Sequence, residues 1–189
     1  MGKRKQSPTH GPPTPLEVIR RRRRRLMDQA AITGFLSRLA LLVAMVAVVF
    51  GLIFGVMAAP NDDMSPRISA GDLLLYYRLT EDWISGDVVV VEQDGNRYVG
   101  RIVARGGDTV EVTEQATLVI NGSTVIESGI YYSTPAYESG VTYPLILAQD
   151  EIFVLCDYRE GARDSRYYGP VNTKDILGKV ITVVRRSNL

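Results

Sequence analysis

Few residues in this sequence have the chemistry of a catalyst. The 189 residues include one histidine, His10, and one cysteine, Cys156. Because His10 lies in the N-terminal tail, these single copies exclude Ser-His-Asp and Cys-His hydrolases, an internal disulfide, and zinc sites built from histidine or cysteine. We expect no metal and no cofactor, so any chemistry has to come from serine hydroxyls, carboxylates or lysines.

Such side chains gather in the segment Asp62-Asp63-Met64-Ser65-Pro66. A serine becomes a nucleophile only when a base takes its proton. Two carboxylates act together only when they share a proton at close range. Asp62 and Asp63 are neighbours in an extended segment and point to opposite faces, so an aspartic-protease mechanism is not expected from them.

Strands are the elements that would have to position these residues. Asn121-Gly122 predicts a tight hairpin turn, because both turn positions need positive φ. No long amphipathic helical pattern follows Ala59, so we predict an all-β domain, either a partly closed barrel or a pair of sheets. Runs rich in Val, Ile and Tyr predict strands at residues 72–79, 87–92, 98–104, 109–113, 117–120, 123–126, 151–155 and 176–184.

An apolar segment without charges, residues 39–59, precedes this domain. As a helix it would be about 31 Å long, enough to cross a hydrocarbon core of about 30 Å. Residues 1–38 carry ten Lys and Arg against two acidic residues (10 − 2 = +8), and residues 60–189 carry twelve against nineteen (12 − 19 = −7). The positive-inside rule then places the N-terminus in the cytoplasm.

We therefore predict a single-pass protein of the cell membrane. Residues 1–38 form a basic, partly disordered cytoplasmic tail, 39–59 the transmembrane anchor and 60–189 an extracytoplasmic domain. A cleaved signal peptide is the alternative for the apolar segment. The run Arg20–Arg25 is expected to lie on anionic membrane lipid, and the net charge of +1 argues against a nucleic-acid partner.

Three segments, residues 62–72, 98–110 and 156–170, together resemble the type I signal peptidases, membrane-anchored Ser/Lys proteases. That family shows S-M-x-P-T-L, then Y-x-K-R-x-x-G-x-P-G-D, then G-D-N-x-x-x-S-x-D-S-R-x-x-G-P. The third segment is the most specific match, with Asp164-Ser165-Arg166 followed by Gly169-Pro170. The resemblance implies a mostly β, outward-facing domain on one membrane helix.

The resemblance also shows where this chain departs from the family. By the register of the three segments, the nucleophilic serine, the general-base lysine and the serine that bonds the lysine correspond to Asp63, Gly100 and Ala162. Nothing in that register brings Lys174 or Lys179 to position 100. Arginine stays protonated and cannot replace the lysine. We therefore expect no catalytic residue at these three positions.

The other residues of the motifs are expected to keep the fold and the cleft. The resemblance implies partner or peptide binding at Asp63, Met64, Pro66, Tyr98 and Gly100. It implies structural roles for Arg101, Asp108, Asp157, Asp164, Ser165 and Arg166, with an ion pair between Asp164 and Arg166 beside the site.

The function implied by this pattern is binding without cleavage. The chain resembles the pilus-associated subgroup of signal peptidase-like proteins in Gram-positive bacteria, which also carry Asp and Gly in place of Ser and Lys. The implied role is that of a chaperone for secreted or pilin segments in sortase-linked pilus assembly, with sortase as a further partner. The alternative is an active signal peptidase with non-standard catalytic residues such as Ser65 or Asp63.

Overall fold

The computed structural model describes residues 15–138 and 140–185. The expectations about the first 14 residues, including His10 and the predicted disorder, lie outside this range. The chain divides into two compact units, residues 1–47 and 48–189, which are described separately.

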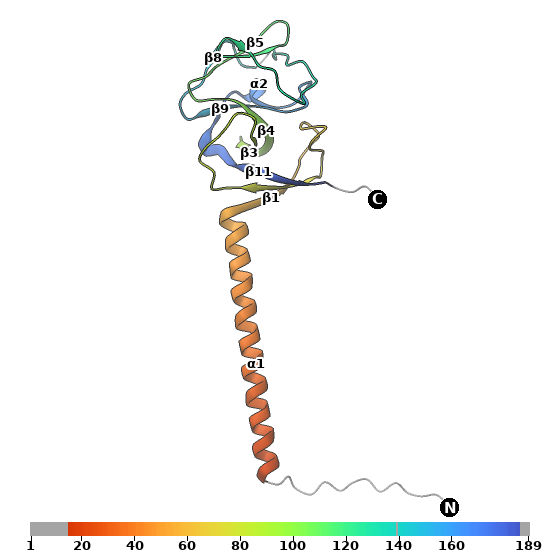
Figure 1. Ribbon diagram of the computed structural model, residues 1–189, viewed down its shortest axis with the longest axis vertical. Helices are drawn as coiled ribbons and strands as arrows, with labels where there is room; N and C mark the ends of the chain where they lie inside the picture. The colour runs from red at the N-terminus through yellow and green to blue at the C-terminus, as the bar shows by residue number, and fades with distance from the viewer. Residues whose placement is uncertain (1–14, 139, 186–189) are drawn as a thin grey trace, which may run out of the picture. The chain divides into compact units, whose positions relative to one another are not determined.

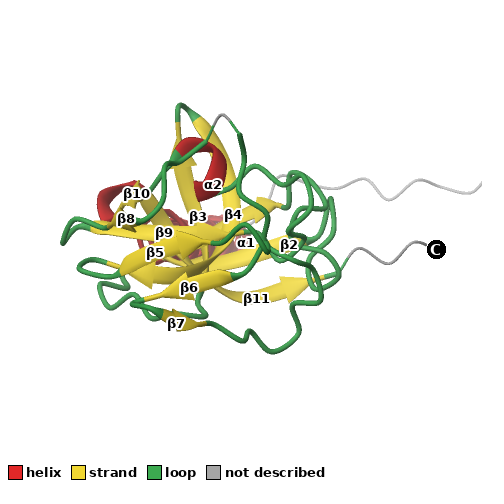
Figure 2. Cartoon of the chain, turned by 90° about the horizontal axis from the view of Figure 1, so that it is seen from above, coloured by secondary structure: helices red, strands yellow, loops and turns green. Residues whose placement is uncertain are grey.

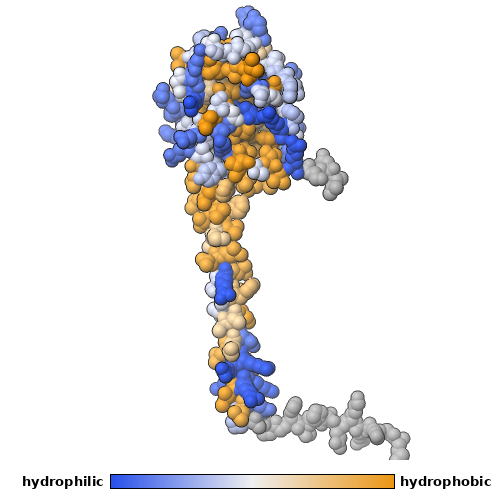
Figure 3. Space-filling model, viewed as in Figure 1, coloured by the Kyte–Doolittle hydropathy of each residue, from blue (hydrophilic) through white to orange (hydrophobic). Residues whose placement is uncertain are grey.

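The described part of the first unit is helical. α1 runs over Pro15–Val48 and continues as one π-helical turn over Val49–Ile53. Beyond a hydrophilic region near its start, hydrophobic side chains cover most of the helix, apart from one hydrophilic patch partway along it (Figure 3). Pro15–Ile53 is long and apolar enough to cross a membrane, as expected for a single anchor, and it is the one such helix in the described part of the chain.

The helix ends earlier than the sequence predicts. Phe54–Ala58 forms strand β1, which pairs antiparallel with β2, Leu73–Tyr77. Gly55 lies against the Tyr76 ring, where a Cβ would overlap the aromatic atoms. The predicted helix over residues 39–59 is therefore wrong beyond Ile53, because an apolar run alone does not separate a helix from a buried strand.

The second unit consists of two antiparallel sheets (Figures 1 and 2). The larger sheet has the order β1-β2-β11-β3-β4-β9-β10, and the smaller one has the order β7-β6-β5-β8. This arrangement confirms the all-β prediction and each of the predicted strands. The further strands of the large sheet are β3 Val88–Gln93, β4 Asn96–Arg105, β9 Glu151–Leu155, β10 Val171–Asn172 and β11 Ile176–Val184. Those of the small sheet are β5 Thr109–Val112, β6 Leu118–Ile120, β7 Ser123–Thr124 and β8 Leu145–Ile146.

Short elements complete the domain. They are the helix α2, Ser165–Tyr168, and the 3-10 turn Thr173–Asp175. The Asn121-Gly122 turn joins β6 to β7 with φ of 52° and 76°, which confirms the predicted hairpin. Its Asn121 amide donates to Asp108 Oδ1 at 2.8 Å, and Asp108 Oδ2 accepts the Arg105 backbone N–H at 2.9 Å. Asp108 therefore joins the β4–β5 turn, which connects the two sheets, to the β6–β7 hairpin turn.

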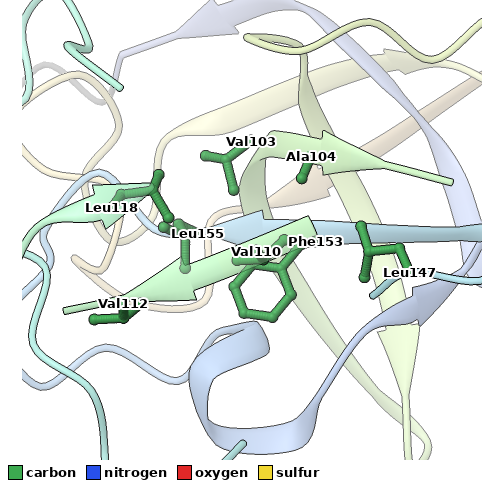
Figure 4. Close-up of a cluster of buried hydrophobic side chains, with 8 residues drawn as sticks. All are labelled: Val103, Ala104, Val110, Val112, Leu118, Leu147, Phe153 and Leu155. Carbon is green, nitrogen blue, oxygen red and sulfur yellow. The ribbon is translucent and has the colours of Figure 1, made fainter. Parts of the chain in front are cut away.

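A hydrophobic cluster between the sheets forms the main core (Figure 4). Phe153 and Leu155 of β9 meet Val110 of β5 and Leu118 of β6 there. All four side chains are buried. This core fixes β9, and the loop that follows β9 carries much of the candidate site.

Candidate functional site

Asp63 lies on the loop between β1 and β2. Its Oδ2 accepts a hydrogen bond from Asn61 Nδ2 at 2.8 Å, and its backbone N–H donates to Asn61 Oδ1 at 3.2 Å. The Asp63 carbonyl accepts the Tyr158 backbone N–H at 2.8 Å, which joins this loop to the segment after β9. The side chain is half-buried.

The electrostatic surroundings of Asp63 are unfavourable for a charge. Burial raises the pKa of its carboxyl above the usual value, and the nearby carboxylates of Asp164 and Asp62 raise it further. Hydrogen bonds from the Arg163 backbone amide and the Asn61 side chain lower the pKa, but they do not offset the burial. Such a carboxylate is a poor nucleophile for a peptide bond and has no hydroxyl to be activated.

Ala162 and Met64 lie in the same buried cluster behind Asp63. Met64 is 2% exposed and Ala162 is 1% exposed, and both pack with Val99 of β4 and Cys156. Cys156 is buried, and burial raises the pKa of its thiol well above the usual value, so it remains a thiol at neutral pH. This cluster brings together the three segments that the sequence motifs single out.

Gly100 lies in β4, opposite Val89 of β3. A Cβ built on Gly100 would lie 3.3 Å from Val154 Cβ and 3.5 Å from the Leu155 carbonyl oxygen. A side chain at this position is therefore tight but possible after a small shift of Val154. Because glycine has no side chain, position 100 of this chain provides no amine that could act as a base.

The two lysines in the described part of the chain have other surroundings. Lys179 on β11 forms an ion pair with Asp87 at 2.7 Å. Lys174 lies in the 3-10 turn, where its backbone N–H is capped by Asn172 at 3.0 Å. These two lysine side chains therefore provide no base for Ser65, which lies two residues beyond Asp63.

Two arginine–aspartate pairs frame the site. Arg101 on β4 donates from Nε and Nη2 to the two oxygens of Asp157, at 2.8 and 2.6 Å. Arg166 donates from Nε and Nη2 to the two oxygens of Asp164, at 2.9 and 2.8 Å, and both side chains are almost fully buried. Bidentate pairs of this kind fix orientation as well as charge.

The Asp164-Ser165-Arg166 turn also covers the free edge of β9. Ser165 Oγ accepts the Val154 backbone N–H at 3.0 Å, and Asp164 Oδ2 accepts the Cys156 N–H at 3.1 Å. These bonds satisfy strand groups that would otherwise be buried without partners. The segment thereby ties α2 to the core of the sheet.

The sequence motifs did not indicate a role for a second buried arginine, Arg159. Its guanidinium donates to both oxygens of Glu127, at 2.8 and 2.7 Å, and to Thr134 Oγ1 at 2.9 Å. It therefore pins the long loop after β7 to the site. Of the predicted binding residues, Met64 and Gly100 are buried, Pro66 is exposed, and Tyr98 packs on Tyr168 with ring centroids 5.3 Å apart.

An open groove of about 620 Å³ lies next to the loop that carries Asp63 and reaches as far as Asn61. Asn61, the hydrogen-bond partner of Asp63, is part of its wall. The other lining residues are Met57, Pro60, Glu92, Gly95, Asn96, Arg97 and Tyr98.

One side of this groove is an unpaired strand edge. Residues 96–100 of β4 pair with β3, whereas pairing of β4 with β9 begins only at Arg101. Within the described residues no strand covers the other edge of residues 96–100. The Val99 carbonyl on this side accepts only a weak bond from the Cys156 thiol, at 3.5 Å. Val99 and Gly100 are buried against the end of β9 and Cys156, so the backbone offered to an extended chain is that of residues 96–98.

Comparisons with known proteins agree with these motifs. Residues 32–185 match the family described as "Signal peptidase, peptidase S26". The chain is 31% identical over 132 residues to "Probable signal peptidase I-2" of Synechocystis, covering 64% of this chain but only 58% of that protein. It is 24% identical over 153 residues to "Inactive signal peptidase IA" of Staphylococcus aureus, covering 75% of this chain and 86% of that protein. A crystal structure of a signal peptidase I from Enterococcus faecalis aligns with a TM-score of 0.46 at 27% identity, covering 54% of this chain and 98% of that one.

Proposed function

The chain belongs to the signal peptidase family, peptidase S26, and from this premise we propose that it is a membrane-anchored member that binds extended protein segments without cleaving them. The observation that carries the proposal is the composition of the site. A carboxylate, a glycine and an alanine occupy the positions of the nucleophile, the base and the partner of the base.

The surroundings of the site support the loss of catalysis. Activation of a hydroxyl requires a nearby base. Lys179 is engaged with Asp87, and Lys174 lies in the turn before β11. The Staphylococcus aureus relative whose name includes the word "Inactive" is consistent with a family in which some members have lost the reaction.

The framework of a binding cleft is nevertheless retained. The Arg101–Asp157 pair joins β4 to the segment after β9, and the Arg166–Asp164 pair fixes the start of α2. An extended segment can add to the open edge of β4 at residues 96–98, where main-chain hydrogen bonds give affinity and the groove receives side chains. This mode needs no catalytic group.

For the partner we propose a secreted or pilin segment in sortase-linked pilus assembly, with the chain acting as a chaperone at the cell membrane. This part rests on the resemblance of the Asp and Gly replacements to the pilus-associated subgroup. The charge of −7 on residues 60–189 would favour a basic partner segment.

The test compares the unmodified full chain in detergent with a variant in which the site is restored. We expect a labelled signal peptide to bind the unmodified protein saturably and to remain intact by mass spectrometry. The triple variant Asp63→Ser, Gly100→Lys, Ala162→Ser should gain cleavage. The matched control has Gly100→Met in place of Gly100→Lys and should stay inactive, since methionine supplies no base. Cleavage by the unmodified protein, or absence of saturable binding, would refute the proposal.

A further inference from the structure

Among the described residues, Asp63, at the position of the family's nucleophile, has no cationic partner, in contrast to three other carboxylates around the site. Asp157, Asp164 and Glu127 each have both carboxylate oxygens bonded by one arginine, at distances of 2.6 to 2.9 Å. No Lys or Arg of residues 15–138 and 140–185 forms an ion pair with Asp63. The nearest candidate, Arg163, stacks its guanidinium on the Tyr167 ring at 4.5 Å instead.

The position of Asp63 leaves its carboxylate accessible to an incoming cation. It is only half-buried, and it is bonded to Asn61, which forms part of the groove wall. Burial and the like charges of Asp62 and Asp164 make the isolated carboxylate unfavourable. A positive charge supplied from outside would relieve this repulsion and complete the pattern of the other three carboxylates.

The groove next to the Asp63 loop suits a long aliphatic side chain that ends in a charge. Met57, Pro60 and the Tyr98 ring supply apolar surface along its wall. A lysine buries its four-carbon stem on such surface and keeps its ammonium at the end. On an extended segment bound at the β4 edge, alternate side chains point to one face, so one of them can be directed to the groove.

We propose that the groove receives a lysine side chain of the bound segment and that its ammonium pairs with Asp63. This inference rests on the proposed binding function and specifies what the bound segment must carry. The Asp63 carboxylate already accepts bonds from the Asn61 amide and the Arg163 backbone N–H. An ammonium is a compact point charge that needs only one further accepting direction, so it can pair with a carboxylate whose orientation these two bonds already fix.

The experiment uses the full chain in detergent and short acetylated, amidated Ala/Ser peptides that carry one central lysine, norleucine or arginine. Binding is followed by fluorescence anisotropy. We expect the lysine peptide to bind about tenfold more tightly than the norleucine peptide, because a charge-assisted hydrogen bond is gained. Asp63→Asn should abolish this difference, and the matched variant Asp82→Asn, at an exposed carboxylate outside this groove, should preserve it.

The outcomes separate the inference from the function on which it rests. If the lysine and norleucine peptides bind equally well, the lysine assignment is wrong and the groove still binds extended segments. If the arginine peptide matches the lysine peptide, the assignment to a primary amine is wrong. If no peptide binds, the proposed function fails and the inference with it. If the unfolding midpoint of Asp63→Asn at pH 7 is no lower than that of the wild type, a loss of lysine selectivity in this variant is a local effect at the site and not a loss of folding.

Discussion

The backbone amide of Asp157 donates to the sulfur of Met64 at 3.4 Å. The two residues are 93 positions apart in the chain, and the contact joins the loop that carries Asp63 to the end of β9. The Met64 side chain also fills the cluster that contains Val99 and Ala162. A single thioether therefore fixes the site loop against both of the other motif segments.

This contact predicts an unequal effect of two substitutions at Met64. Met64→Ala should lower the free energy of unfolding by about 2–5 kcal/mol, because it leaves a cavity in a buried cluster. Met64→Leu nearly conserves the volume and should cost less than about 1.5 kcal/mol. Urea unfolding of the full chain, followed by the fluorescence of Trp83, the single tryptophan, measures both. Equal losses in the two variants would contradict the packing described.

The buried Arg166–Asp164 pair predicts a larger loss. Arg166→Leu leaves Asp164 buried without its counter-charge and should cost about 3–5 kcal/mol. The matched control is Arg97→Leu, since the Arg97–Glu92 pair is 3.6 Å long and its side chains are 53% and 46% exposed. That change should cost less than about 1 kcal/mol. A similar midpoint in urea for the two variants would show that the buried pair is dispensable.

The raised pKa of Asp63 predicts a pH-dependent difference between the wild type and Asp63→Asn. Because the native carboxyl binds a proton more readily than the unfolded one, the wild type loses stability as pH rises from the ordinary value of 3.8 through the raised pKa. The variant lacks this titration. Its stability relative to the wild type should therefore increase between acidic and neutral pH, as measured by thermal unfolding across this range. A difference that stays constant or falls would contradict the prediction.

The reactivity of the Cys156 thiol measures how often the buried cluster at the site opens to solvent. Its thiol is 2% exposed and its raised pKa suppresses the reactive thiolate. Alkylation of the native chain should be slower than that of the urea-unfolded chain by about a hundredfold or more. Since Cys156 is the single cysteine, mass spectrometry reports it without ambiguity. Comparable rates in the two states would mean that the segment after β9 opens freely.

Much of the fold follows from local sequence patterns. The β-branched runs predict their strands because each run alternates or packs on a pleated surface, and Asn121-Gly122 predicts its turn because both residues tolerate positive φ. The change from helix to strand at Phe54 is different. It depends on pairing with Leu73–Tyr77, and nothing within the apolar run itself records that partner.

The residues of the candidate site can also be predicted in part from the sequence. The motif spacing indicates which segments belong together, and the structure brings Met64, Val99 and Ala162 into one cluster. The pairing of Arg159 with Glu127 was not predictable, because the two residues are 32 positions apart and lie outside any local pattern. The absence of an arginine partner for Asp63 within the part of the chain that the structure describes, in contrast to Asp157, Asp164 and Glu127, likewise becomes visible only in the structure.

The early end of the helix at Ile53 has a consequence for how Arg38 meets a lipid bilayer. From Leu39 to Ile53 the uncharged helical stretch has about 15 residues and a length of about 22 Å, which is less than the hydrophobic thickness of a typical bilayer, about 30 Å. A spanning helix that finishes at Ile53 must draw on residues as early as Gly34. In such a helix Arg38 would lie below the headgroups on the N-terminal side, and its guanidinium would have to extend toward the helix N-terminus to reach the phosphates.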